Sequence, residues 1–486
     1  MAHAYTIPRR ILQPRVQQIA WPKDPERLFC ALARRRGCVW LDSAAGPGHL
    51  ARWSVLAAEP SAILTCEASA RLRDAAGKLL CDTRRNPFHV LREALSAVRL
   101  DPAGGAARLP YGPGFYGYLA YDLAPRVEPK AGLSATRDIP LPDLWFGLYE
   151  AVLVLDHERR EASLVGQPGP AWAALEEALK AADSPSADAP GTAAGPRPPG
   201  VTCNFTRDGY LRAIDQARQY IAAGDIYQVN LSRRFTVRLP PAAAGRPPVD
   251  LYLALRHANP APYAAYLDLG GGQAVLSSSP ELFLSLQAGR VVTRPIKGTR
   301  PLRPGDAAFN ARQQADLVAS EKDRAELVMI VDLERNDLGR VCSYGTVRVT
   351  EPRALEAYAA VYHTTATVQG RLHEGHDLVD LLKASFPGGS ITGAPKVRSM
   401  QIIAELEPTR RSVYTGAVGY LAPPTRADPA GRCVLNIAIR TLLVAGPSVH
   451  LQVGGGIVAD SDPEAEFEET CDKARAMFQA LGLASE

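Results

Sequence analysis

The sequence Val291-Val292-Thr293-Arg294-Pro295-Ile296-Lys297-Gly298-Thr299-Arg300 places a lysine just beyond a β-branched run. Such runs favour strands, and proline removes a backbone donor, so we expect a strand that ends or lies at a sheet edge here. Alternate side chains of a strand share one face, which would aim Lys297 from a stiff element. An aimed lysine can act as a nucleophile or bind an anion, whereas most lysines are simply solvated.

Outward from this strand, extended and helical segments follow one another without the dinucleotide fingerprint of a βαβ unit. Alternating or continuous apolar runs predict strands, and apolar spacings of three and four predict helices. We expect strands at 38–41, 53–58, 148–155, 226–237, 417–421 and 433–444. We expect helices at 86–98, 210–221, 250–258, 306–333, 397–406 and 463–481. This mixture favours an α+β fold with a large, mostly antiparallel core.

Residues 182–200 are mostly Ala, Pro, Gly, Ser and Asp, which is typical of a linker or an exposed loop. We therefore divide the chain into an N-terminal α+β region at 1–181 and a second region at 201–486. The patterns that indicate chemistry lie in the second region.

The composition is that of a globular protein, with 46% hydrophobic and 22% charged residues. A formal net charge of +4 is mild for 486 residues, and it gives no basic stripe of the kind that nucleic-acid binders need. The eight cysteines are scattered without a C-x-x-C pair, which favours reduced thiols and a cytoplasmic protein. We expect no secretory signal in residues 1–16 and no membrane span, since no apolar, uncharged stretch reaches about 20 residues.

Two pairs of acids stand at helical spacing. Asp323 and Glu326 are three residues apart, just before an apolar run, so we expect them to enter a buried segment and to need a partner. Glu466 and Glu469 are three apart on the last predicted helix, with Lys473 four residues further on. Two helices that each bring two carboxylates could hold one Mg²⁺, a hard cation that takes oxygen ligands. The alternative is a solvated helix face with ordinary ion pairs.

Two features indicate anion binding. The glycine-rich stretch 388–396 leads into a predicted helix, whose free N–H groups attract a carboxylate or phosphate, but it lacks the order of an ATP-binding loop. Arg440 lies in the apolar run 434–443, so its guanidinium should be paired, either with a substrate carboxylate or with a structural acid. Gly454-Gly455-Gly456 is expected to form a sharp loop.

The predicted strand at 226–237 alternates between apolar and polar side chains. Its polar face could line a site or could be an exposed sheet face; it consists of Gln228, Asn230 and Ser232. Taken together, the acids, the anion-binding features and Lys297 suit a small dianion that is handled with Mg²⁺ and without ATP.

Six motifs follow one another in the second region. They are GDIYQVNLS at 224–232, SPE at 279–281, PIKGTR at 295–300, DLERNDLGR at 332–340, FPGGSITGAPK at 386–396 and ETCDKA at 469–474. In this order they resemble the motifs of the chorismate-utilising enzymes, from about residue 203 to 480, with a looser resemblance at 53–60. The resemblance implies the α+β fold of anthranilate synthase component I, in which large, mostly antiparallel sheets pack as a two-layer core with helices outside. Residues 201–486 would be the chorismate-binding catalytic region.

Two positions distinguish members of that family. Gln228 falls where isochorismate and salicylate synthases carry a lysine that activates water, so the resemblance implies ammonia as the nucleophile here. Lys297 falls where anthranilate synthases carry alanine and aminodeoxychorismate synthases carry lysine. The resemblance therefore implies conversion of chorismate and ammonia to 4-amino-4-deoxychorismate, a precursor of para-aminobenzoate and folate. The rival activity is that of anthranilate synthase component I.

The resemblance also implies catalytic roles. Lys297, in its neutral form, would attack C2 of chorismate and form a covalent adduct, and ammonia would then add at C4 and expel the lysine. Glu281 would be the general acid that protonates the departing C4 hydroxyl, which requires a raised pKa. His363 would lie near the reacting ring.

The same resemblance implies residues that bind the cofactor and the substrate. Glu326 and Glu469 would bind Mg²⁺, supported by Asp323 and Glu466. Mg²⁺ and Lys473 would hold the ring carboxylate. The remaining substrate-binding residues would be Gln228, Thr392, Gly393, Tyr420, Arg440, Gly454, Gly455 and Gly456, of which Arg440 and Tyr420 would hold the enolpyruvyl carboxylate.

The chain carries no G-x-C-x-G nucleophile turn of a glutaminase. We therefore expect ammonia to come from a separate glutamine amidotransferase subunit. No lyase segment is evident either, so we expect the aminated product to be released.

Overall fold

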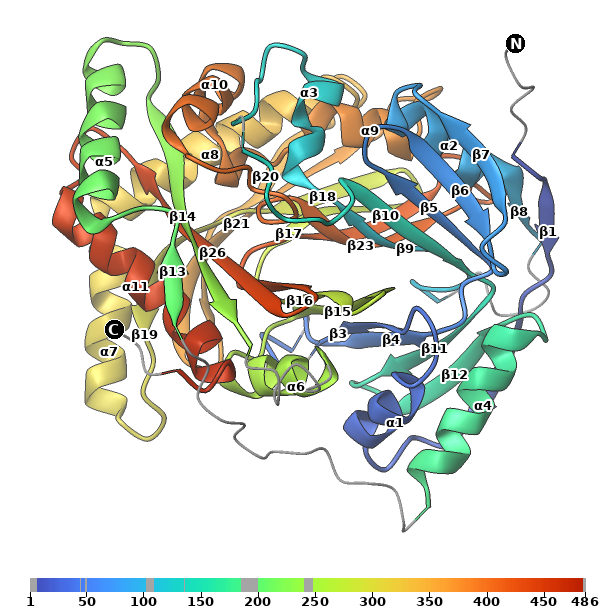
Figure 1. The fold of residues 1–486 in the computed structure, drawn as a ribbon. Coiled ribbons are helices and arrows are strands. Elements are labelled where there is room, and N and C mark those ends of the chain that lie inside the picture. Colours follow the sequence, from blue (N-terminus) through green and yellow to red (C-terminus); the bar gives the residue numbers. More distant parts are fainter. Residues whose placement is uncertain are drawn as a thin grey trace.

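Two twelve-stranded sheets lie face to face and form the body of the molecule (Figure 1). The computed structural model describes residues 7–43, 45–48, 50–101, 109–134, 136–184, 200–239 and 248–483. Within both large sheets the neighbouring strands run antiparallel, as at the pair of the long strands β14 and β26. The predicted α+β fold, with a two-layer, mostly antiparallel core and helices outside, is therefore confirmed.

The first sheet holds the strand on which Lys297 lies. In spatial order it contains β19 (Ile296–Pro301), β21 (Val361–Arg371), β18 (Arg290–Arg294), β17 (Leu282–Gln287), β24 (Arg432–Ile437), β23 (Ala417–Ala422), β9 (Gly114–Leu119), β10 (Leu144–Tyr149), β5 (Ala62–Cys66), β6 (Ala70–Asp74) and β7 (Leu79–Thr83), with β20 (Arg348–Ala357) paired to β21. As expected, β19 lies at the edge of that order, and Pro295 interrupts the extended run just before it.

The second sheet holds the glycine run near the C-terminus. In spatial order it contains β13 (Val201–Cys203), β14 (Gln228–Arg238), β26 (Ser448–Ile457), β25 (Thr441–Ala445), β16 (Gln273–Ser279), β15 (Tyr263–Gly270), β3 (Val39–Asp42), β4 (Trp53–Ala57), β11 (Ala151–Asp156), β12 (Glu161–Gly166) and β2 (Arg15–Ile19), with β22 (Gly393–Ala394) paired to β14. A short parallel pair, β1 (Arg10–Leu12) and β8 (Val98–Leu100), stands apart.

Helices cover the outer faces of both sheets, and each layer has its own apolar cluster. The helices are α1 (Pro25–Leu32), α2 (Pro87–Ala97), α3 (Ala124–Val127), α4 (Pro170–Ala182), α5 (Arg207–Ala222), α6 (Pro248–Ala258), α7 (Ala307–Ala319), α8 (Glu321–Gly339), α9 (Leu378–Ser385), α10 (Lys396–Leu406) and α11 (Pro463–Ala480). One cluster packs α2 and α9 against the first sheet, and another packs α1, α4, α6 and α11 against the second. A third cluster, which includes Tyr116 and Leu443, fills the space between the sheets.

Both sheets contain strands from both halves of the chain. In the first sheet β9 pairs with β23, and in the second sheet β3 pairs with β15. The regions 1–181 and 201–486 therefore share their two sheets and their core. Most of the predicted linker, residues 185–199, lies outside the described residues.

Two of the predicted strands are each two strands in different sheets. The segment predicted at 148–155 ends β10 and begins β11, with Glu150 between them. The segment predicted at 433–444 contains β24 and β25, and Arg440 lies in the turn between them with a positive φ of 51°. Strands that are buried on both faces are apolar along their whole length, so a single charged residue, Glu150 or Arg440, was the one local sign of each passage between the sheets.

Two further predictions need correction. The single helix predicted at 306–333 is two helices, because Ser320 ends α7 and caps α8 by accepting a hydrogen bond from the backbone N–H of Asp323. The loop predicted at Gly454-Gly455-Gly456 is the end of strand β26. The predicted last helix is confirmed: Asp462 caps α11, and Pro463 occupies its first turn.

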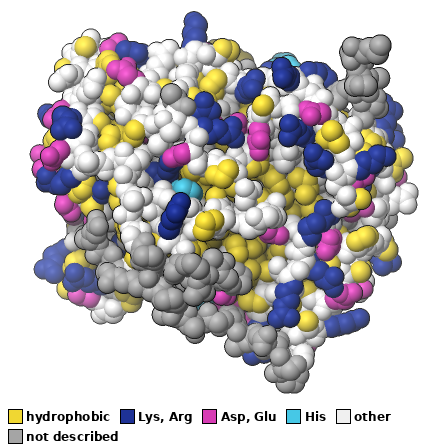
Figure 2. Space-filling model, in the orientation of Figure 1, with side chains coloured by type: hydrophobic (Ala, Val, Ile, Leu, Met, Phe, Trp, Pro, Cys, Tyr) yellow, Lys and Arg dark blue, Asp and Glu magenta, His cyan; other side chains and the backbone are white. Residues whose placement is uncertain are grey.

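Basic and acidic side chains are interspersed on the face shown in Figure 2, and no stripe of a single sign crosses it. Among the described residues, no helix is both long enough and apolar enough to cross a membrane.

A buried ion pair joins the elements that flank the candidate site. The guanidinium of Arg411 and the carboxylate of Glu407 are each 1% exposed and 2.7 Å apart. Arg411 also donates hydrogen bonds to the carbonyl oxygens of Ile391 at 3.0 Å and Asn230 at 2.7 Å, while Glu407 accepts from the backbone N–H of Ser232 at 2.8 Å. The pair therefore ties β14 to the glycine-rich turn around residue 391.

We expect Arg411→Leu to lower the free energy of unfolding by about 3–5 kcal/mol, because Glu407 would stay buried without a counter-ion. Urea unfolding followed by circular dichroism measures this. The matched control is Arg324→Leu, which removes an exposed arginine paired with Glu321 and should change the free energy by less than about 0.5 kcal/mol. Equal effects of the two substitutions would show that the buried pair has no special structural importance.

Candidate active site

Several predicted site residues contact the glycine run at the end of β26, which lies on the left of Figure 1. A Cβ atom on Gly456 would lie 2.1 Å from Nε2 of Gln228 and 3.3 Å from Nζ of Lys297. A Cβ atom on Gly455 would lie 2.9 Å from Oε2 of Glu466 and 4.0 Å from Nζ of Lys473. These glycines therefore let the ends of polar side chains approach a strand closely, and they do not form the turn predicted from their sequence.

The acids predicted to bind a metal lie on α8 and α11, and each is paired with a basic side chain. Glu326 is 3.8 Å from Lys297, Asp323 is 3.3 Å from Arg300, and Glu466 is 3.4 Å from Lys322. Glu469 pairs with Lys473, whose ammonium also donates to the carbonyl oxygen of Gly454 at 2.8 Å. Within the described ranges no three acidic, histidine or cysteine side chains are arranged as a metal site. The oxygen donors are those that a hard divalent cation prefers, and three ammonium groups and the guanidinium of Arg300 pair with them here.

The pKa shifts of these groups follow from burial and from the pairing. Burial raises the pKa of Glu326, with Lys297 acting against this. Lys473 lowers the pKa of Glu469. Partial burial disfavours the charged form of Lys322, but the carboxylates of Glu466, Glu326 and Glu469 outweigh it and raise the pKa of Lys322. Neither Lys322 nor Arg300 was among the predicted site residues. Lys322 directly precedes Asp323, and Arg300 lies three residues after Lys297.

Glu281 lies in the short passage between β16 and β17, where the chain moves from the second sheet to the first. Its side chain is buried, and Oγ of Ser390 donates a hydrogen bond to its Oε1 at 2.6 Å. Burial raises its pKa to about 7, while Ser390, Lys297 and the backbone N–H of Ile296 act in the opposite direction. A carboxyl group with such a pKa can hold a proton near neutral pH and give it up. Ser390 lies in the quoted 386–396 motif but was not predicted as a site residue.

His363 lies on β21, opposite Thr299 of β19. Its Nδ1 is 3.0 Å from Oγ1 of Thr299 and 3.3 Å from the carbonyl oxygen of Gly298. Burial lowers its pKa to about 4, so the imidazole is neutral at physiological pH. If Nδ1 carries the proton and donates to Gly298, Nε2 is left as an acceptor.

Arg440 occupies the passage between β24 and β25, which runs beside the passage that carries Glu281. The backbone N–H of Ile437 donates to the carbonyl oxygen of Glu281 at 3.1 Å, and the N–H of Ser278 donates to that of Arg440 at 3.0 Å. Burial lowers the pKa of Arg440, while Tyr414 and Glu469 act in the opposite direction. Glu469 is itself paired with Lys473. The structural acid considered as a partner for Arg440 is therefore not found among the described residues.

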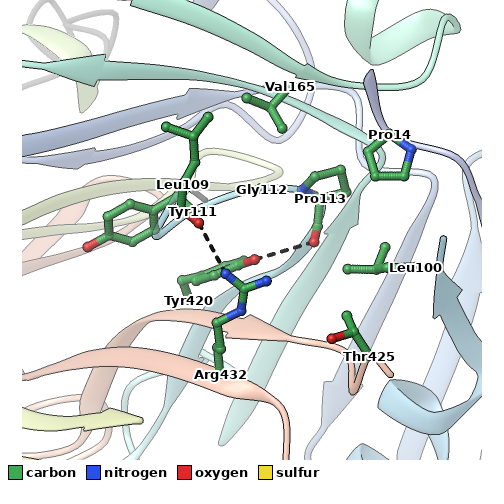
Figure 3. Close-up of a pocket in the computed structure, with 10 residues that line it drawn as sticks. All are labelled: Pro14, Leu100, Leu109, Tyr111, Gly112, Pro113, Val165, Tyr420, Thr425 and Arg432. Atoms are coloured by element: carbon green, nitrogen blue, oxygen red, sulfur yellow. Dashed lines mark hydrogen bonds between the residues drawn. The ribbon is translucent and has the colours of Figure 1, made fainter. Parts of the chain in front are cut away.

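Tyr420 is not brought to this site, which corrects the prediction. It lines a separate small pocket with Tyr111 and Arg432, and its hydroxyl donates to the carbonyl oxygen of Pro113 at 3.4 Å (Figure 3). Its ring packs on Tyr116 in the core between the sheets. The tyrosine close to Arg440 is Tyr414, which is buried in the turn before β23. Both tyrosines flank the same glycine-containing segment, so the sequence pattern alone did not separate them.

The glycine-rich turn lies against the first residues of β14. Gly393 pairs with Val229, and a Cβ atom on Gly393 would lie 2.2 Å from the carbonyl oxygen of Gln228. Thr392 is fully buried, and its hydroxyl donates to the carbonyl oxygen of Gly388 at 2.9 Å. Thr392 and Gly393 therefore shape the wall beside Gln228, whose side-chain Oε1 is buried without a hydrogen-bond partner.

At the end of that turn, Lys396 begins α10 and directs its ammonium back into the protein. It pairs with Asp337 of α8 and donates to the carbonyl oxygens of Ser385 at 2.9 Å and Pro387 at 2.8 Å. The turn predicted to bind an anion is thus fixed to α8 by a buried cation. This role of Lys396 was not predicted, because its contacts are with residues distant in sequence.

Comparisons with known proteins agree with this geometry. The family model described as "chorismate binding enzyme" matches residues 36–479. Aminodeoxychorismate synthase component 1 of Klebsiella aerogenes is 38% identical over 97% of this chain and 100% of its own. Anthranilate synthase component 1 of Streptomyces coelicolor is 43% identical over 80% of this chain and 77% of its own. The crystal structure of anthranilate synthase component I from Streptococcus pneumoniae TIGR4 superposes with a TM-score of 0.73 at 31% identity, over 88% of this chain and 92% of that one. The chain belongs to the chorismate binding enzyme family.

Proposed function

We propose that this protein acts as an aminodeoxychorismate synthase component I, which converts chorismate and ammonia to 4-amino-4-deoxychorismate and water. The observation that supports this most strongly is the position of Lys297. Its ammonium lies over Gly456, 3.8 Å from Glu326, and its charge acts on the buried carboxyl of Glu281. A nucleophile and an acid thus lie near each other, as a substitution in which the hydroxyl group leaves as water requires.

The first step is the displacement of the C4 hydroxyl. Lys297, as the free amine, forms a bond to C2, the two ring double bonds shift, and the C4–O bond breaks. Glu281 donates its proton to the leaving oxygen, so that water departs instead of hydroxide. Ser390 holds Oε1 of Glu281 at 2.6 Å, which orients the carboxyl group.

The second step reverses the electron shift. Ammonia adds at C4, the ring double bonds return to their former positions, and the C2–N bond to Lys297 breaks with the electron pair on the lysine nitrogen. The proton that the new C4 amine loses balances the proton that Glu281 gave. The amide side chain of Gln228 cannot act as a base that activates water, which favours ammonia as the nucleophile.

The two substrate carboxylates meet separate cations. Lys473, held over Gly454, faces the ring carboxylate, and Arg440 with Tyr414 faces the enolpyruvyl carboxylate. A bidentate guanidinium would also fix the direction of that side group. Neutral His363 can accept a hydrogen bond near the ring without adding charge.

Mg²⁺ is the cofactor that the acid cluster fits. Glu326 and Glu469 would hold it, with Asp323 and Glu466 in support, because carboxylate oxygens suit a hard cation. When bound, the ion would neutralise the ring carboxylate. Lys297 lies beside Glu326, and Lys473 lies beside Glu469.

A separate glutamine amidotransferase subunit would supply the ammonia. The relatives named "component 1" are consistent with a second component. Anthranilate synthase component I remains the rival function, because relatives with that name share 43% and 44% identity with this chain. Lys297 is the residue that favours the first activity over the second.

The products of the reaction decide between these two activities. With chorismate, ammonia and Mg²⁺, we expect 4-amino-4-deoxychorismate by liquid chromatography and mass spectrometry, without pyruvate release. Fluorescent anthranilate with an equal amount of pyruvate would establish the activity of anthranilate synthase component I.

We also expect Lys297→Ala to lower turnover by about 10³-fold, because the nucleophile is lost. Unchanged turnover of that variant would exclude the covalent route.

Tyr414 and Tyr420 form a matched pair for testing the substrate site. We expect Tyr414→Phe to raise the KM for chorismate about 5- to 20-fold, since one hydrogen bond to a carboxylate contributes about 1–2 kcal/mol. Tyr420→Phe should leave KM within about twofold. Steady-state kinetics at saturating ammonia measure both, and the opposite ranking would place Tyr420 in the substrate site.

The pH dependence should report Glu281. Its raised pKa of about 7 means that its acid form is lost above pH 7, while the fraction of Lys297 present as free amine grows with pH. The rate, expressed per free ammonia, should therefore bend downward near pH 7 from the rise that deprotonation of Lys297 alone would give, and this bend is the limb that belongs to Glu281. Ser390→Ala removes a hydrogen bond that favours the carboxylate, so this limb should move to higher pH. In Glu281→Gln the limb should disappear, with a rate about 10²- to 10⁴-fold lower. A limb that stays in place in both variants would assign it to another group.

A further inference from the structure

Lys322 is a basic residue of the candidate site to which the proposed reaction gives no task. It lies at the second residue of α8, next to Asp323. Its Nζ is 3.4 Å from Oε1 of Glu466 on α11. Glu466 is only 5% exposed at its side chain and is held by Oγ of Ser461 at 2.7 Å, whereas the side chain of Lys322 is 50% exposed. The half-exposed side chain of Lys322 therefore pairs with a buried carboxylate that a second hydrogen bond holds in place.

The other cations around the acid cluster all have positions that the reaction or the fold uses. Lys297 is the proposed nucleophile, and Lys473 is fixed to the backbone of Gly454. Arg300, which pairs with Asp323, is also tied to Asp316 of α7. Within the described part of the chain Lys322 forms an ion pair with Glu466, and it is close enough to Glu326 and Glu469 for their charges to act on it.

We infer that Lys322 is a counter-cation of the α8–α11 acid cluster, and that Mg²⁺ must displace its ammonium from Glu466 in order to bind. Lys322 would then set how tightly the site binds Mg²⁺. This rests on the metal assignment in the proposed function, and it adds a residue that competes with the metal to those that bind it.

The physical argument concerns charge. Clustered carboxylates repel one another unless positive charge lies between them. An ammonium on a flexible four-carbon stem can supply that charge and can also swing into solvent, because half of the side chain is already exposed. Mg²⁺ and an ammonium on the same carboxylate would repel each other, so binding of the ion and retention of the ion pair oppose each other.

The test is calorimetric titration of the full-length protein with Mg²⁺ alone. We expect Lys322→Met to bind Mg²⁺ about tenfold more tightly than the wild type, since one nearby positive charge is removed. Lys322→Arg keeps the charge and should stay within about twofold of the wild type. Arg324→Met is the matched control: it removes a positive charge from the same helix, but one that pairs with the exposed Glu321, and it should also stay within about twofold.

A thermal melt gives a second readout that does not depend on activity. Without Mg²⁺, Lys322→Met should melt below the wild type, and the rise in melting temperature on adding Mg²⁺ should be larger than in the wild type. A lysine with a merely structural role would lower both melting temperatures without tightening Mg²⁺ binding, which would overturn the inference.

Other results separate this inference from the proposed function. Equal tightening in Lys322→Met and Arg324→Met would reduce the effect to net charge and overturn the inference. Weaker Mg²⁺ binding in Lys322→Met would make Lys322 a support of the site and overturn it as well. Absence of Mg²⁺ binding in every variant would reject the metal assignment and the inference together. The identity of the amination product bears on none of these titrations.

Discussion

The close approach of side chains to the backbone of β26 is the constraint on which the candidate site depends. A side chain on Gly456 would begin 2.1 Å from Nε2 of Gln228 and 3.3 Å from Nζ of Lys297, and one on Gly455 would begin 2.9 Å from Oε2 of Glu466. Only a strand without Cβ atoms leaves this space, and a strand holds its neighbours more rigidly than a loop does. The glycines therefore bring charged groups from α8, α11 and β19 into one small volume.

Burial then determines the charge that each group carries in that volume. Glu281 has a pKa near neutrality and His363 is uncharged, in both cases chiefly because the surrounding sheet and turn exclude water. The acids on α8 and α11 remain balanced by basic partners instead. Glu281 and Glu326 both feel the charge of Lys297, yet Glu281 is held by the hydroxyl of Ser390 whereas Glu326 is paired with the lysine itself.

Sequence patterns predicted those parts of the molecule that depend on local spacing. The acid pairs on α8 and α11, the cap of α11 and the edge position of β19 all follow from residues a few positions apart. Contacts between distant segments escaped prediction, as with Ser390 against Glu281 and Lys322 against Glu466. The assignment of Tyr420 failed for the same reason: nothing local distinguishes it from Tyr414, and only the sheet directs one ring into the core and leaves the other beside Arg440.

Glu281 and Arg440 lie at the two places where neighbouring chain segments pass from one sheet to the other, and backbone hydrogen bonds join these passages. Each residue is therefore anchored to both layers at once. A small shear of one sheet over the other would move the Glu281 carboxyl group and the Arg440 guanidinium together. The apolar side chains packed between the layers resist such a shear, and they thereby help to hold the Glu281 carboxyl group and the Arg440 guanidinium in fixed relative positions.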